Sequence, residues 1–150
     1  MNNMRALLRR AGENRGAAII EVALTLPLLL LVSVGIFEFG RAYQTWQVLT
    51  NAAREGARLA VLPDSNDSAV RNRVVSYMQT GQLPEATHAT IAIDHNTMID
   101  IGIGSTTGSQ VTIQYPFSFI TLQPVARLVV PGGSLGSPIV MAASAMMRNE

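Results

Sequence analysis

The hydrophobic residues form one long run near the N-terminus, and shorter amphipathic segments follow it. From Val22 to Phe37 sixteen consecutive residues carry no charge, and Ala17 to Ile20 extend the run on the other side of Glu21. Together they reach the ~20 residues that cross a bilayer as a helix. Helical spacing without proline then continues from Glu38 to Leu62. We therefore expect a basic leader over residues 1–16, a transmembrane helix over 17–40 and a continuation of that helix over 41–62.

Beyond residue 62 the pattern predicts a second helix and four short strands. Asn66 or Asp67 can cap a helix from Ser68 to about Met78. Alternating apolar and polar residues predict antiparallel strands joined by the turns HNT and GSTTGS, with a short helix or loop at 119–130. The strands are expected at Thr87–Asp94, Met98–Ile103, Gln110–Phe117 and Ile139–Met147. The predicted fold class is α+β, with a four-stranded antiparallel sheet packed on the outer half of the long helix.

The composition agrees with a membrane-embedded part. Of the 150 residues 48% are hydrophobic and 14% charged, and the absence of cysteine excludes disulfides and thiolate sites. Residues 1–16 carry four Arg and one Glu, for +3, whereas 17–150 carry seven Arg and nine acids, for −2. The positive-inside rule places the N-terminus in the cytoplasm and, in a bacterium, residues 41–150 in the periplasm. A chain with this charge balance is not expected to bind nucleic acid.

Two residues of the apolar run are unusual for a plain anchor. An acid at membrane depth costs roughly 2.5–3.5 kcal/mol on insertion scales, so Glu21 is expected to have a function. Pro27 cannot donate to the carbonyl of Ala23, which predicts a kink in the helix. The alternative is that the membrane helix simply tolerates this proline.

The outer half of the long helix carries further candidate residues. Small side chains that would let another backbone approach lie at Ala52, Ala53, Gly56, Ala57 and Ala60. Their partner is either the chain's own sheet or a helix of an assembly. Glu38 and Arg41, three residues apart where the helix leaves the membrane, are expected to form an interfacial pair, and Glu55 is expected to pair with Arg58.

Several motifs resemble those of one family. R-G-A-A-I-I-E, Arg15 to Glu21, resembles the class 3 leader of type IV pilin-like proteins. Ile19 to Val61 is similar to the TadE-like pseudopilins, which carry E-x-A-L-x-L-P-L-L-L, E-F-G-R and N-A-A-R-E-G-A-R. VTIQYPF, Val111 to Phe117, and ASAMMRNE, Ala143 to Glu150, look like the closing strands of that family. The resemblance implies a minor pilin or pseudopilin of the Tad (Flp) pilus that acts in assembly, by priming or at the tip, and in surface adherence.

The resemblance also implies a site and partners. A prepilin peptidase would cut between Gly16 and Ala17, which leaves Glu21 as the fifth residue of the product. The Glu21 carboxylate would pair with the new ammonium of a neighbouring subunit and set the axial stagger. The implied partners are the peptidase, the major Flp pilin, a TadF-like minor pilin, and the inner-membrane platform with its ATPase; no cofactor is implied. The implied location is the bacterial inner membrane, and the extracellular pilus after assembly.

Two other function classes stay open. An uncleaved single-pass anchor would hold a periplasmic binding module, and signal peptidase cleavage after Ala42 would release a secreted enzyme. The sequence contains no phosphate-binding loop, zinc-ligand spacing or nucleophile elbow. His88 and His95 have too few companion ligands for a metal or catalytic site, and Asp94 and Asp100 would bind calcium only weakly. The chain is therefore not expected to be an enzyme or to hold a metal.

Overall fold

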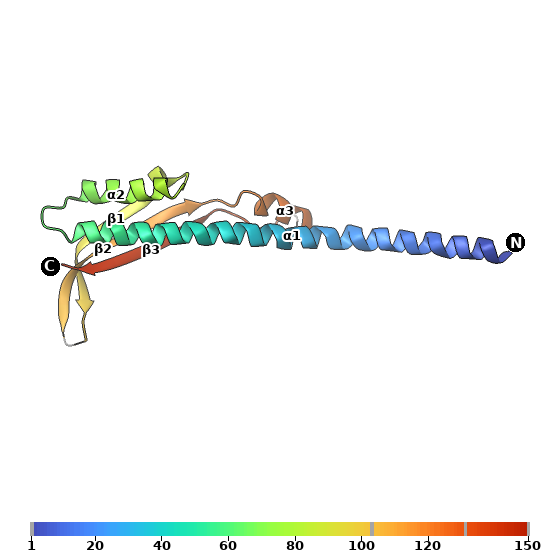
Figure 1. The fold of residues 1–150 in the computed structure, drawn as a ribbon, viewed down its shortest axis with the longest axis horizontal. Coiled ribbons are helices and arrows are strands. Elements are labelled where there is room, and N and C mark those ends of the chain that lie inside the picture. The colour runs from blue at the N-terminus through green and yellow to red at the C-terminus, as the bar shows by residue number, and fades with distance from the viewer. Residues whose placement is uncertain (1, 103, 131, 150) are drawn as a thin grey trace. The chain divides into compact units, whose positions relative to one another are not determined.

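The computed structural model describes residues 2–102, 104–130 and 132–149, and their side chains except those of 2–15 and 129. Its first element is a single helix, α1 (Asn2–Ala60), which ends two residues before the predicted end at Leu62. The later elements are α2 (Asp67–Thr80), the 3₁₀ turn η1 (Ala86–His88), β1 (Thr90–Asp100), β2 (Ser105–Phe117), α3 (Leu122–Val129) and β3 (Ile139–Arg148) (Figure 1). The α+β fold class predicted from the sequence is confirmed.

The chain divides into two compact units. The first, here called the helix-loop unit, contains Met1–Glu38 and Phe119–Ser137, and the second, the sheet unit, contains Phe39–Ser118 and Pro138–Glu150. The helix α1 contributes residues to both units. The side chains of the predicted leader, up to residue 15, lie outside the described residues.

The sheet has three antiparallel strands in the order β1-β2-β3, so the expectation of four strands was wrong. The two segments expected to form a hairpin around HNT belong to one strand, β1. Asp94 pairs with Gln110 and Thr97 with Gly108, which leaves two residues of β1 opposite one of β2. This arrangement is a β-bulge, which absorbs an extra residue without ending the strand. The true turn follows Asp100, and β2 begins within the predicted turn GSTTGS.

Helix α2 begins and ends where local chemistry favours it. The Asn66 side chain accepts a hydrogen bond of 2.7 Å from the amide of Ala69, which satisfies one of the free donors at the first turn. At the other end, the amide of Gly81 donates to the carbonyl of Tyr77. The buried residues of α2 are Val70, Val74 and Met78, the same three that the sequence pattern places on one side. In the sheet unit α2 runs alongside the C-terminal part of α1 (Figure 1).

The core of the sheet unit lies between the two helices and one face of the sheet. Alternate residues of β2, namely Val111, Ile113, Tyr115 and Phe117, are buried. Leu49 and the small residues of α1 are buried in the same unit. The opposite face carries exposed polar residues such as Gln114 and Ser144. The alternation of the strands therefore places one side of the sheet in the core and the other toward solvent.

Candidate functional site

The N-terminal part of α1 presents a long apolar surface. Gly16–Ala60 is the one segment among the described residues that is long and apolar enough to cross a membrane. Its most apolar 18-residue window has a mean hydropathy of 2.4, and none of that window is buried. Ile19, Leu24 and Ile36 are among the exposed side chains. Because such a continuous apolar surface is unfavourable in water, this part of α1 has the properties of a single-pass membrane anchor.

The predicted cleavage residues and the predicted acid lie on the uncovered part of this helix. Gly16, Ala17 and Glu21 are helical and exposed, and a Cβ added at Gly16 would meet nothing within 4 Å. Ala17 and Glu21 are four residues apart, so they lie on one face, one turn from each other. The Glu21 main-chain carbonyl also accepts a hydrogen bond of 2.9 Å from the hydroxyl of Thr25. Among the described residues, no other segment covers Gly16 or the Glu21 side chain.

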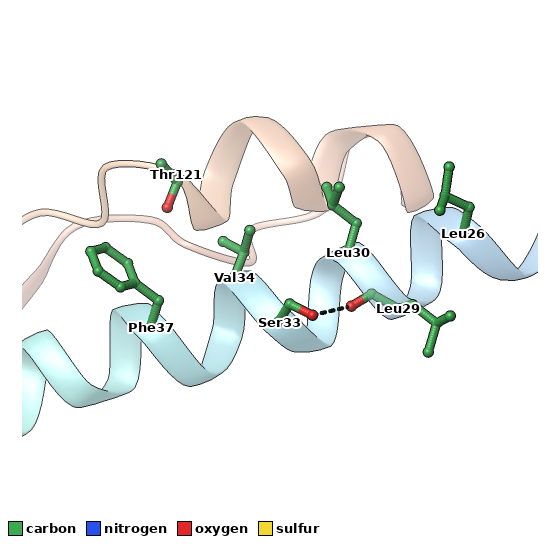
Figure 2. Close-up of a pocket in the computed structure, with 7 residues that line it drawn as sticks. All are labelled: Leu26, Leu29, Leu30, Ser33, Val34, Phe37 and Thr121. Atoms are coloured by element: carbon green, nitrogen blue, oxygen red, sulfur yellow. Dashed lines mark hydrogen bonds between the residues drawn. The ribbon is translucent and has the colours of Figure 1, made fainter.

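Pro27 lies inside α1, which is assigned as helix on both sides of it. Its ring nitrogen cannot donate, so the carbonyl one turn earlier loses its helical partner. The predicted kink stays a prediction. Beyond Pro27 the helix borders an open, mostly apolar hollow, and Figure 2 shows its lining residues. These are Leu26, Leu29, Leu30, Ser33, Val34, Phe37 and Thr121.

Glu38, the first residue of the predicted interfacial pair, is fully buried in the helix-loop unit. Its Oε1 accepts hydrogen bonds from the amide of Ile120 at 2.8 Å, the amide of Thr121 at 2.6 Å and the hydroxyl of Thr121 at 2.9 Å. Hydrogen bonds to a charged acceptor are stronger than neutral ones and offset the cost of burying the carboxylate. Thr121 is the N-cap residue of α3, so Glu38 fixes the point at which this helix begins.

Arg41 contacts the end of β2 in the sheet unit. Its guanidinium donates to the carbonyl of Ser118 and lies over the ring of Phe117, 4.4 Å from the ring centroid. Cation and ring attract each other at this distance, and the planar guanidinium suits such stacking. Arg41, a residue of α1, therefore connects this helix to the end of β2 within the sheet unit. The expected pairing of Glu38 with Arg41 stays a prediction.

The small residues of the outer helix lie inside the sheet unit. Ala52, Ala53, Ala57 and Ala60 are buried. A Cβ added at Gly56 would lie 2.6 Å from Cγ2 of Val74 and 3.2 Å from Cγ1 of Val111, closer than side-chain atoms normally approach. The close approach of α1 to α2 and β2 therefore depends on a glycine at this position. The alternative partner, a helix of another subunit, stays a prediction for other faces of α1.

Glu55 connects α1 to α2 on the surface of the sheet unit. Its Oε1 lies 3.1 Å from Arg58 of the same helix, as the spacing predicts, and 2.6 Å from Arg73 of α2, which the sequence analysis missed. The hydrogen bonds from Arg58 and then Arg73 lower the pKa of Glu55 to about 2. The carboxylate therefore stays charged at any physiological pH, and its ion pair with Arg73 connects α1 to α2.

The remaining polar candidates have local partners. His95 Nε2 lies 2.9 Å from Asp67, and His88 Nδ1 lies 2.5 Å from Glu85. Asp94 accepts hydrogen bonds from the amide of Asn96 and the hydroxyl of Thr97, which lower its pKa, and these contacts hold the bulge of β1. Among the described residues no group of three His, Cys, Asp or Glu side chains is placed to hold a metal ion.

The sequence analysis missed the contacts of Glu38 with Ile120 and Thr121. The available signal was its position directly after the apolar run Val22 to Phe37, because a carboxylate at the end of such a run has limited access to water and needs protein donors. What the sequence could not show was the source of these donors, since Ile120 and Thr121 lie more than 80 residues away, with sequence separations of 82 and 83.

Comparison with known proteins adds one match. Residues 16–58 match the model of the family described as TadE-like protein. This range contains each predicted site residue except Ala60. No curated protein and no solved structure matches the chain. The resemblance that the sequence motifs indicated is therefore confirmed over residues 16–58.

Proposed function

We propose that this chain, TadE-like over residues 16–58, is a minor pilin or pseudopilin associated with the Tad pilus. The family match carries the proposal, because it covers the anchor helix and the E-F-G-R block together. The continuous α1, apolar at one end and packed on a sheet at the other, supports it. In this function the chain assembles with other subunits and catalyses no reaction.

The proposal includes processing at the peptide bond between Gly16 and Ala17. The bond lies in α1, so a peptidase must first unwind the helix locally. Glycine lowers helix stability by about 1 kcal/mol relative to alanine, which favours such unwinding at this position. No neighbouring side chain covers Gly16 among the described residues. Removal of residues 1–16 would take away the +3 of the leader and leave a free ammonium on Ala17.

The proposal assigns Glu21 to assembly. An exposed carboxylate in the apolar part of α1 is unfavourable in the bilayer until it meets a positive charge. The ammonium of Ala17 on a neighbouring subunit would supply that charge, so a paired state in the filament is favoured over a lone subunit. The partners proposed from the family are the prepilin peptidase, the major Flp pilin, a TadF-like minor pilin, and the inner-membrane platform with its ATPase.

The location belongs to the same proposal. The arginine-rich end of the chain would lie in the cytoplasm, and residues 41–150 would lie in the periplasm or, after assembly, in the extracellular filament. A role in priming the filament or at its tip, and in surface adherence, follows from the family resemblance.

The first test is the intact mass and N-terminal sequence of the protein from cells that contain the matching peptidase. A chain that begins at Ala17 is expected. Gly16→Val should abolish this cleavage, whereas Gly40→Val, the same change at another exposed glycine of α1 with nothing within 4 Å, should be cut normally. A chain that begins at Met1 would favour the uncleaved anchor, and one that begins at Tyr43 a secreted domain.

The second test separates assembly from processing. Glu21→Leu is expected to insert and to be cut at Ala17, but to enter sheared filaments at least tenfold less than wild type, as measured by immunoblot. Thr25→Val is the matched control, because it removes a polar group one turn away without removing a charge. Normal incorporation of Glu21→Leu would contradict the charge-pair mechanism.

A further inference from the structure

The segment Phe119–Ser137, here called the α3 loop, is longer than its place in the sheet requires. It connects β2 to β3, which are neighbours with Phe117 paired to Ile139. Antiparallel neighbours can be joined by a turn of a few residues. The α3 loop is much longer than such a turn and contains a helix of its own, α3. Its contacts therefore indicate what it does beyond joining the two strands.

The α3 loop keeps some apolar residues inside and exposes others. Leu122 and Ala126 of α3 are buried, whereas Ile120 and Leu128 are exposed by 66% and 74%. Val130 and Leu135 are exposed as well. The loop contains no acid and one basic residue, Arg127, which is also exposed. The exposed apolar side chains are unfavourable in water, and together with an arginine they suit the boundary of a bilayer.

The α3 loop lies beside the anchor helix within the helix-loop unit. Along α1 the half-buried residues are Pro27, Leu31, Val34 and Gly35, followed by the buried Glu38, a spacing that marks one face of the helix. Figure 2 shows Leu26, Leu30 and Val34 pointing toward the ribbon of the loop. The three hydrogen bonds from Ile120 and Thr121 to Glu38 fasten the loop at this position.

The length of the apolar run limits where the α3 loop can lie relative to the membrane. A bilayer needs about 30 Å of apolar length, and an α-helix rises 1.5 Å per residue. If the loop kept residues 26–38 in water, only residues 17–25 would remain for the membrane, about 14 Å of helix. That is roughly half of the required span. The anchor can cross the membrane only if residues beside the loop are also embedded.

We propose that the α3 loop inserts into the membrane together with α1, in the half of the bilayer from which α1 leaves toward Phe39. Ile120, Leu128 and Leu135 would contact acyl chains, and Arg127 would lie near lipid phosphates. Its backbone suits this depth, since the amides of Val125, Val130 and Gly133 donate within the loop. The inference does not depend on the pilus function, because it requires only the anchor helix and the loop.

Single-cysteine spin labelling of the full chain tests the proposal. The native sequence has no cysteine, so a label attaches only where one is introduced. The labelled protein is reconstituted in vesicles of phosphatidylethanolamine and phosphatidylglycerol, and its collisions with oxygen and with a water-soluble nickel complex are measured. Leu128→Cys should collide with oxygen at least threefold more than with nickel. Leu24→Cys, on the uncovered part of α1, provides the reference for a lipid-exposed label.

Met98→Cys is the matched control for an exposed apolar position in water. Met98 lies on β1 between Asp94 and Asp100, where two carboxylates disfavour lipid. A Leu128 label with the nickel preference of the Met98 label would overturn the proposal. A Leu128 label shielded from both reagents would also overturn it, because another protein chain would then cover the loop. A label on Ile120→Cys, at the other end of the loop, provides a second measurement. It is also expected to collide more with oxygen than with nickel.

Discussion

At the scale of single residues, the Glu38 side chain contacts the first residues of the α3 loop through one oxygen atom. Oε1 of Glu38 accepts all three hydrogen bonds that Ile120 and Thr121 donate to this side chain. Two of the donors are main-chain amides that precede α3, so no change of side chain at 120 or 121, except to proline, removes them. The acid of the E-F-G-R block thus connects α1 to a segment 82 residues further along the chain.

We predict that Glu38→Ala weakens this connection and that Glu38→Gln does so much less. Alanine leaves two amides and a hydroxyl without their acceptor, at a cost of about 1–3 kcal/mol. Glutamine keeps an oxygen at the same position and loses only the charge. The measurement is amide hydrogen exchange of Ile120 and Thr121 in micelles, with denaturant unfolding alongside. Equal protection of these amides in both variants would contradict the assigned role of Oε1.

At the scale of elements, the sequence predicted helices better than strands. The ends of α2 have local causes, such as the Asn66 cap, so α2 was expected within two residues of its true bounds. The prediction wrongly divided β1 into two strands, because Asn96 and Thr97 after His95 are residue types that often form turns. Here Asp94 bonds to Asn96 and Thr97, which builds a bulge in a continuing strand. Turn residues alone do not distinguish these outcomes.

The sequence pattern also did not predict which residues of different elements contact each other. The spacing of Glu55 and Arg58 predicted their pair, because the helix period determines it. Arg73 reaches the same carboxylate only because Gly56 lets α2 pack closely on α1. Likewise, the spacing paired Glu38 with Arg41 of the same helix, but gave no sign of its contacts with Ile120 and Thr121. Periodicity predicts neighbours along one element, and tertiary packing determines the others.

We predict that the connection of α1 to α2 depends on pH through Glu55. Its pKa in the folded chain, about 2, lies below the ordinary value of 4.5, so the charged form is favoured by folding. The resulting stability is fully present above pH 4.5 and is lost as the pH falls toward 2. The test is the difference in unfolding free energy between wild type and Glu55→Gln from pH 6 to 2, which should shrink toward zero as the pH falls. A constant difference would contradict the role of the charge.

At the scale of the whole molecule, the two units differ in the environment of their apolar side chains. The sheet unit buries Leu49, Val74 and Ile113 in a core of its own. The helix-loop unit leaves most of its apolar side chains exposed, which requires a membrane or another subunit around them. If the chain assembles as proposed above, its sheet unit can stay folded while the anchor moves from lipid into the assembly. The sequence analysis predicted a transmembrane helix over 17–40 and one outer domain over 41–150, and that assignment stays a prediction.

This division predicts that the sheet unit folds without the helix-loop unit. A chain of residues 39–118 joined to 138–150 by a short Asn-Gly turn should be a soluble protein with cooperative thermal unfolding, because Phe117 and Ile139 are already paired at the junction. Residues 39–150 with the α3 loop retained form the control. That chain keeps the exposed Ile120 and Leu128 but lacks the part of α1 that groups with them, so it should sediment with vesicles or aggregate. Circular dichroism and analytical ultracentrifugation distinguish the two. Loss of cooperative unfolding in the shortened chain would mean that the core of the sheet unit needs the α3 loop.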